Sequence, residues 1–144
     1  MTKRQQIVDA LDARLKSITM ANGYSTDIGK KVSAWRSAPL AESEPFVLIY
    51  RDTECPKEAP EAGRHRHSLQ IEMTILVRSS TSPGTVRAMI GDVVKAIGTD
   101  PRLGGLALWA ALVADSLAVE RETRTLAGAD LSWQITYSTP LWEV

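Results

Sequence analysis

Two arginines and two histidines stand together in the run Arg64-His65-Arg66-His67, the first place in the sequence where chemistry could be expected. Histidines two positions apart on a strand point to the same side and could share a metal ion. A closed metal site needs about four ligands, but no Cys, Asp or Glu cluster stands at a matching spacing. His67 also continues the apolar register of Leu69. The run is therefore interpreted as the solvated start of a strand and not as a metal site. The alternative is that Arg64, His65 and Arg66 form a cationic patch that contacts a partner.

The other candidate catalytic groups are isolated from one another. Cys55 is the single cysteine, and its neighbours Glu54 and Glu58 would raise the pKa of the thiol and keep it unreactive. Gly104-Gly105 lacks the Lys-Ser/Thr that follows in a phosphate-binding loop. Nowhere does the sequence assemble a base, a nucleophile and oxyanion donors. We therefore expect a protein that is not an enzyme and that needs no cofactor.

Composition and charge limit the classes of function that remain. The chain has 144 residues, with 17 Lys+Arg against 17 Asp+Glu, which fits one domain spanning residues 1–144. Bulk binding of nucleic acid is excluded because no net positive charge would collect phosphates. Charged residues make up 24% and hydrophobic residues 44%, so a wholly disordered chain is excluded too. The longest apolar stretch, 103–119, is interrupted by glycines and Asp115, so we expect no membrane partner.

Two segments have the period of amphipathic helices. Residues 3–19 carry an apolar stripe, Thr2 and Gln5 have capping-box spacing, and Asn22-Gly23 is expected to end this helix. Ser82-Pro83 is typical of a helix start, so a second helix is expected at 84–98. The stripe of the first helix consists of Val8, Leu11, Leu15 and Ile18. The apolar residues of the second are Val86, Met89, Ile90, Val93, Val94 and Ile97.

The expected strands differ in how clearly the sequence marks them. Residues 24–36 indicate a weak, lysine-rich edge strand, and 46–50 are apolar on both faces, as in a central strand. Strict alternation over 67–78 predicts a strand with one buried face, and a final hairpin ends in the alternating stretch 132–138. The segment 52–66, with prolines and many charges, is expected to be a mobile loop. The order α-β-β-β-α-β-β predicts an α+β fold: a mainly antiparallel sheet of about five strands with two helices packed on it.

Several stretches together resemble the tail terminator proteins of long-tailed bacteriophages and prophages. These stretches cover most of the chain. They are the opening Arg4-Gln-Gln-Ile-Val-Asp-Ala-Leu, the strand and acidic loop Pro45-Phe-Val-Leu-Ile-Tyr-Arg-Asp-Thr-Glu54, Gly63-Arg-His-Arg-His-Ser-Leu-Gln-Ile-Glu72, the turn Asp100-Pro-Arg-Leu-Gly-Gly-Leu-Ala-Leu108, and the ending Leu126-Ala-Gly-Ala-Asp-Leu-Ser-Trp-Gln-Ile-Thr-Tyr137.

The resemblance implies a structural subunit of the virion tail, assembled in the host cytoplasm. Such a subunit forms a homo-oligomeric ring, expected to be a hexamer, that caps the tail tube protein, ends polymerisation and presents a surface to a head-neck connector protein. By this analogy the apolar segment 106–113, despite its high helix propensity, is expected to be irregular, with a strand from about residue 115.

Contact residues are expected where large or charged side chains are exposed. Trp133 alternates with polar residues and is expected in the core, whereas Trp35 and Trp142 could be exposed, and exposed tryptophans are enriched at interfaces. The alternative is that both cover the edge of the core. Trp35 and the hairpin residues Arg121 and Arg124 are the candidates for subunit contacts, and the loop 52–66 could become ordered against a neighbouring ring.

Two other functions stay open from the sequence. One is a neck or tail-completion subunit on the head side of the virion. The other is a small α+β ligand-binding module unrelated to phage, which would need a well-formed apolar pocket with a few convergent polar groups.

Overall fold

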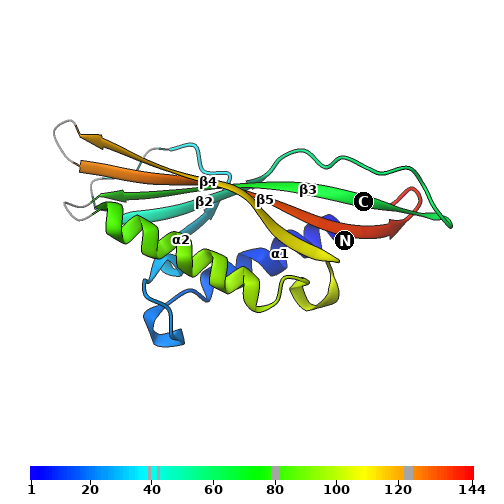
Figure 1. Cartoon of the computed structure of the whole chain (residues 1–144), viewed down its shortest axis with the longest axis horizontal. Coiled ribbons are helices and arrows are strands. Elements are labelled where there is room, and N and C mark those ends of the chain that lie inside the picture. Colours follow the sequence, from blue (N-terminus) through cyan, green and yellow to red (C-terminus); the bar gives the residue numbers. More distant parts are fainter. Residues whose placement is uncertain (39, 42, 79–81, 122–124) are drawn as a thin grey trace.

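The computed structural model describes residues 1–144 except positions 39, 42, 79–81 and 122–124. Figure 1 shows a long sheet with both α-helices on one of its faces. Its elements, in chain order, are α1 (Lys3–Lys16), β1 (Val32–Ala34), β2 (Phe46–Asp52), β3 (Arg64–Arg78), α2 (Ser82–Thr99), β4 (Trp109–Arg121) and β5 (Thr125–Pro140). Short 3-10 turns lie at Met20–Asn22, Ile28–Lys30 and Leu103–Gly105.

The sheet has the order β1-β2-β3-β5-β4. Only β1 and β2 are parallel, and every other neighbouring pair is antiparallel. The predicted α+β class, the mainly antiparallel sheet and the order of elements are therefore confirmed. None of the helices in the described ranges is long and apolar enough to cross a bilayer.

The core lies between the helices and one face of β3 and β5. Along β3, every second residue from His67 to Val77 is buried, as the alternation predicts. Trp133, Ile135 and Tyr137 on β5 are buried beside them. The intervening residues of both strands form the opposite face of the sheet, which neither α-helix covers (Figure 1).

The first helix forms where the stripe predicts it but ends earlier than expected. Thr2 caps it by accepting a hydrogen bond from the Gln5 backbone N–H. Ile7, rather than Val8, is the fully buried residue of its first turns, together with Leu11 and Leu15. Asn22-Gly23 does not end this helix: the helix stops at Lys16, and Gly23, with φ 89°, ends the separate turn Met20–Asn22.

The weak strand expected at 24–36 is mostly wrong. Only Val32–Ala34 forms a strand, and a 3-10 turn at Ile28–Lys30 precedes it. This turn lies tightly against the end of the first helix, since a Cβ on Gly29 would lie 2.6 Å from the carbonyl oxygens of Leu15 and Ile18. Buried Asp92 of α2 accepts hydrogen bonds from the Ser25 and Thr26 backbone N–H groups at 3.1 and 2.8 Å. Tertiary contacts with α1 and α2 therefore determine the conformation of this segment.

Two further expectations are corrected by pairing along the sheet. Segment 106–113 is not irregular throughout: β4 begins at Trp109, opposite Thr136, and continues through an irregularity between Leu112 and Ala114. Pairing with β5 overrides the helix propensity of its alanines and leucines. Within the expected loop 52–66, residues 53–61, here called the strap, run along β3. The strap is fastened by backbone hydrogen bonds from Thr53 to Gln70, from Ser68 to Pro56 and from Glu58 to Arg66.

Candidate interaction surface

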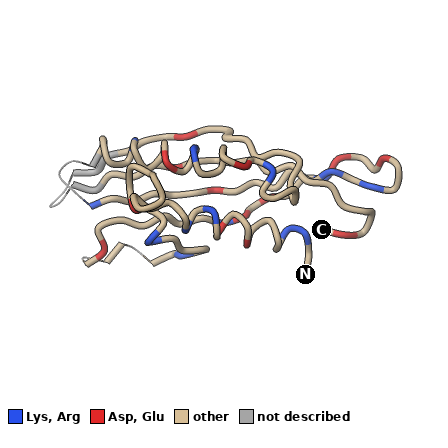
Figure 2. The backbone as a smooth tube through the Cα atoms, turned by 90° about the horizontal axis from the view of Figure 1, so that it is seen from below, with Lys and Arg blue, Asp and Glu red and all other residues tan. Residues whose placement is uncertain are grey.

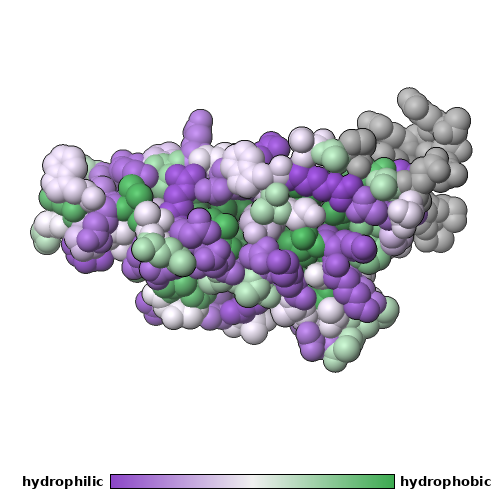
Figure 3. All heavy atoms as spheres, turned by 180° about the vertical axis from the view of Figure 1, so that it is seen from behind, coloured by the Kyte–Doolittle hydropathy of each residue, from purple (hydrophilic) through white to green (hydrophobic). Residues whose placement is uncertain are grey.

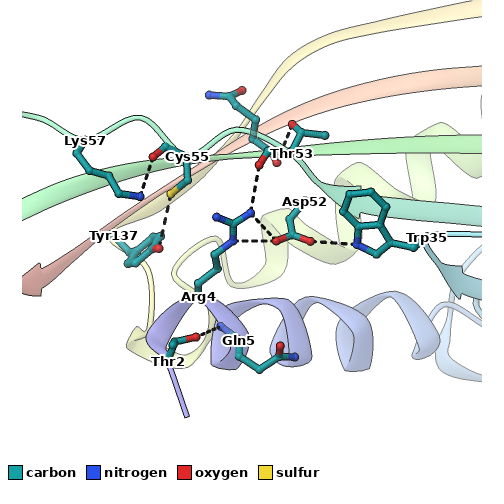
Figure 4. A network of polar contacts seen from close by, with 10 residues as sticks. Thr2, Arg4, Gln5, Trp35, Asp52, Thr53, Cys55, Lys57 and Tyr137 are labelled. Carbon is teal, nitrogen blue, oxygen red and sulfur yellow. Dashed lines mark hydrogen bonds and ion pairs between the residues drawn. The ribbon is translucent and has the colours of Figure 1, made fainter. Parts of the chain in front are cut away.

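Trp35 is an exposed aromatic residue held in a fixed position at one edge of the sheet. Its side chain is 61% exposed although it directly follows β1. The indole N–H donates to the Asp52 carboxylate at 3.2 Å, and Arg4 from α1 holds the same carboxylate in an ion pair of 2.7 Å (Figure 4). Arg4 also donates to the Thr53 carbonyl at 3.1 Å. Three segments of the chain therefore fix the orientation of one indole before any partner arrives.

The backbone at Trp35 supports the same conclusion. Its φ of 56° lies in the left-handed region, which a bulky side chain seldom occupies. Strain of this kind costs on the order of 1–3 kcal/mol and persists where the surroundings enforce it. Here the Trp35 N–H is also held by the Tyr50 carbonyl at 2.9 Å. A side chain presented in this way loses little conformational entropy on binding, which is typical of an interface anchor.

Beside Trp35 lies a polar cleft of about 440 Å³ between α1 and the β1–β2 edge. Its floor includes Tyr50, whose hydroxyl donates to Asp12 at 2.7 Å, and Asp12 also pairs with Lys16 at 2.8 Å. Burial and the bond to Asp12 raise the pKa of Tyr50 well above its ordinary value. The hydroxyl is therefore a neutral hydrogen-bond donor, and its bond to Asp12 joins α1 to β2.

The predicted cationic patch at Arg64, His65 and Arg66 is not a uniform positive surface. Arg64 turns back onto β5 and donates to the Ser138 hydroxyl and carbonyl at 3.1 and 3.2 Å. His65 contacts the Glu143 carbonyl at 3.2 Å. Glu58 and Glu61 line the same hollow as these three residues. Figure 2 likewise shows blue and red segments side by side in this part of the chain.

His67 belongs to the core, as its register with Leu69 predicts. Its ring is fully buried, stacks on Tyr137 with centroids 4.5 Å apart, and is bonded through Nε2 to the Thr139 hydroxyl at 2.7 Å. Burial, and then the positive charges of Lys57, His65 and Lys3, lower the pKa of His67 to about 4. Tyr137 also contacts the Cys55 sulfur at 3.7 Å. The described contacts of the Cys55 sulfur thus include the phenol of Tyr137 and no imidazole. Within the described residues, no group of three His, Cys, Asp or Glu could hold a metal ion.

The candidate contact residues are not brought together. Arg64–Arg66 lie at the end of the sheet where β3 begins, and Arg121 lies at the other end, opposite Thr125 in the β4–β5 pair. Arg124 falls outside the described residues, and of Arg121 only the backbone is described. Trp133 is buried, as expected, and Trp142 is 96% exposed, which decides between the two alternatives that the sequence left open for it.

Comparisons with known proteins add no relative. No protein-family model matches the chain, and no curated protein matches its sequence. The resemblance to tail terminators therefore stays a prediction.

Sequence reasoning missed one exposed apolar segment on β4. Trp109 and Val113 are 56% and 60% exposed, and they lie on the edge of the sheet opposite Trp35. Because segment 106–113 was expected to be irregular, these residues were not candidates. The signal was present in the sequence: Leu106–Ala114 contains no charge and no proline, and it includes a tryptophan and a β-branched valine. Together, Trp35, Trp109 and Val113 place large apolar groups at both edges of the sheet.

Proposed function

We propose that this chain is a structural subunit of a phage or prophage tail. It assembles with copies of itself into a ring that caps the tail tube, stops its polymerisation and prepares the tail for joining to the head. The expected ring is a hexamer, its partners are the tube protein and a head-side connector, and its place is the virion tail.

The observation that carries the proposal is the fixed, exposed Trp35, matched by exposed Trp109 on the other edge of the sheet. A ring needs heterologous contacts, in which two different surfaces of the same subunit meet. Apolar anchors at both edges of one sheet supply two such surfaces. The balance of 17 basic and 17 acidic residues removes large self-repulsion between copies. The resemblance in sequence supports the choice of a tail cap among ring-forming proteins.

The outer surface is compatible with a subunit that contacts several protein partners. Figure 3 shows hydrophilic residues over most of one face, with small hydrophobic groups between them. Figure 2 shows both signs of charge spread along the described chain. Protein interfaces of this mixed kind are about as apolar as the rest of a protein surface and gain their strength from a few anchors.

Electron microscopy of the protein mixed with purified tail tubes tests the proposal. A ring at one tube end, and tubes that no longer elongate in the presence of tube protein, are the expected results. Tubes that bind no cap and elongate as before would contradict it. Binding to heads instead of tubes would identify the neck subunit. A ligand-induced rise in melting temperature, without any assembly, would identify the binding module.

A further inference from the structure

The sheet has two edges of very different length. The edge strand β1 has 3 residues, whereas β4 has 13. In the described sheet β4 pairs with β5 on one side only, so its other side presents unpaired backbone groups. Natural proteins protect such an edge with lysines, prolines or covering segments. From Leu106 to Ala114 this chain has no charged residue and no proline.

Exposed apolar side chains gather on the same edge. Leu108, Trp109 and Val113 are 40%, 56% and 60% exposed. Ala111 and Ala114, next to them in the strand, are also exposed and leave room beside the backbone. An edge whose first part, up to Ala114, is uncharged and carries these side chains is suited to pairing with another strand.

The register of the sheet shows which strand would match. Ala34 lies opposite Tyr50, and the same row continues through Met73 and Leu131 to Asp115. The next row therefore runs from Trp35 at one edge to Ala114 at the other. One parallel and three antiparallel pairings make β1 antiparallel to β4. In a ring whose axis follows the strands, the β1 edge of one subunit thus meets the β4 edge of the next in antiparallel orientation.

We propose that the β4 edge pairs with β1 of a second copy of this chain, so that the backbone of Trp35 lies opposite Ala114 and next to Val113. The inference rests on the ring proposed above and names the contact that would close it. It covers both free edges of the sheet in one interface. Charge agrees with it: exposed Lys31 enters β1, whereas exposed Asp115 lies on β4.

Engineered disulfides test the contact directly. Ser33 and Ser116 occupy the two ends of one row of the sheet. In a Cys55→Ser background, Ser33→Cys is combined with Ala114→Cys, Ser116→Cys or Ala118→Cys, which allows for a shift of two residues in register. At least one pair is expected to give a ladder of covalent oligomers under mild oxidation, because paired strands bring Cα atoms within disulfide range.

Two controls separate the alternatives. Ser33→Cys with Ala111→Cys places the second thiol about 16 Å further along the strand from Ser116, at roughly 3.3 Å per residue, and should give no ladder. Ser116→Cys alone should stay monomeric on a denaturing gel. If instead it forms covalent dimers, β4 pairs with itself and the proposal is wrong. Rings without a ladder from any of the three pairs would also overturn it, while leaving the capping function intact.

A charge on the edge gives an independent readout. Val113→Lys should weaken association at least about tenfold, because the contact would bury an unpaired ammonium group. Met20→Lys is the matched control, since Met20 is also 60% exposed but lies in a turn on the helical side of the sheet. Both variants should keep the wild-type melting curve at dilution where copies are separate. Equal ring formation by the two variants would contradict the proposed contact. Absence of rings and caps from the wild type would instead refute the capping function, and a ladder would still identify the contact.

Discussion

Replacing His67 by phenylalanine should change how the stability of the protein depends on pH. The pKa of His67 is lowered from 6.5 to about 4 in the folded chain, first by burial and then by nearby positive charge. Its Nδ1 has no hydrogen-bond partner among the described contacts, so a proton there would be buried without an acceptor. The unfolded chain therefore binds a proton at higher pH than the folded chain does, and the wild type loses stability as the pH falls below 6.5.

The size of the lost stability follows from the difference between the pKa values of His67 in the unfolded and folded chain. Each unit of difference is worth about 1.4 kcal/mol, so the wild type should lose about 2 kcal/mol at pH 5 and about 3 kcal/mol near pH 4 through this residue. His67→Phe has no such term, keeps an aromatic ring against Tyr137, and leaves Thr139 its bond to the Glu143 carbonyl. Carboxylates titrate in both proteins, so their effect cancels in the difference.

Urea unfolding of both proteins between pH 7.5 and 4.5 is the assay. A difference in unfolding free energy that is the same at every pH reports the change in packing. A difference that grows as the pH falls reports the protonation of His67. Two stability curves that run parallel over this range would contradict the lowered pKa of His67. The chain has only two histidines, so a His65→Gln variant leaves one imidazole resonance for NMR titration. A midpoint at 6.5 or above would refute the argument independently.

Three further substitutions, with Gly91→Ala as a control for the first, test the packing that positions the surface. Gly29→Ala should destabilise the protein by several kcal/mol in urea unfolding, because the new Cβ would lie 2.6 Å from two backbone oxygens. Gly91→Ala in α2 is the control: its new Cβ would meet open space, and it should stabilise the protein by up to about 1 kcal/mol. Asp92→Ala should cost about 2–3 kcal/mol in chemical denaturation by removing the acceptor of the Ser25 and Thr26 N–H groups, and an unchanged midpoint would contradict this. Tyr50→Phe should cost about 1 kcal/mol in the same measurement through the lost bond to Asp12, and a stabilised variant would show that this bond contributes nothing.

The sequence predicts those parts of the fold that have their own periodicity. Strict alternation from His67 to Val77 and the apolar stripe of α1 each mark a buried face, and both faces are buried in the structure. The segment 24–36 could not be predicted in this way, because a carboxylate more than 60 residues away, Asp92, holds its backbone. Segment 106–113 was expected to be irregular from the resemblance, and its local helix propensity gave no sign of a strand; pairing with β5 makes it a strand from Trp109 onward.

The candidate surface was predictable only in part. Trp35 was selected as an exposed aromatic residue, and its exposure is confirmed. Its fixation was not visible, because it depends on Arg4 and Asp52, which are brought together only by the packing of α1 on β2. Arginines and histidines adjacent in sequence suggested a patch, but Ser138 and Glu143, on and just beyond β5, occupy two of these side chains.

The strap leaves little free backbone for strand addition along the outer side of β3. Residues 53–61 cover the outer side of β3 beyond the end of β2, and the strap contains Pro56 and Pro60, which have no N–H to donate to an incoming strand. The strand at that edge of the sheet, β1, has only three residues. Runaway growth into fibrils needs long edges on both sides of each chain. If copies pair as proposed above, one long edge and one short edge should give weak contacts that dissociate and re-form, which favours small closed assemblies over fibres.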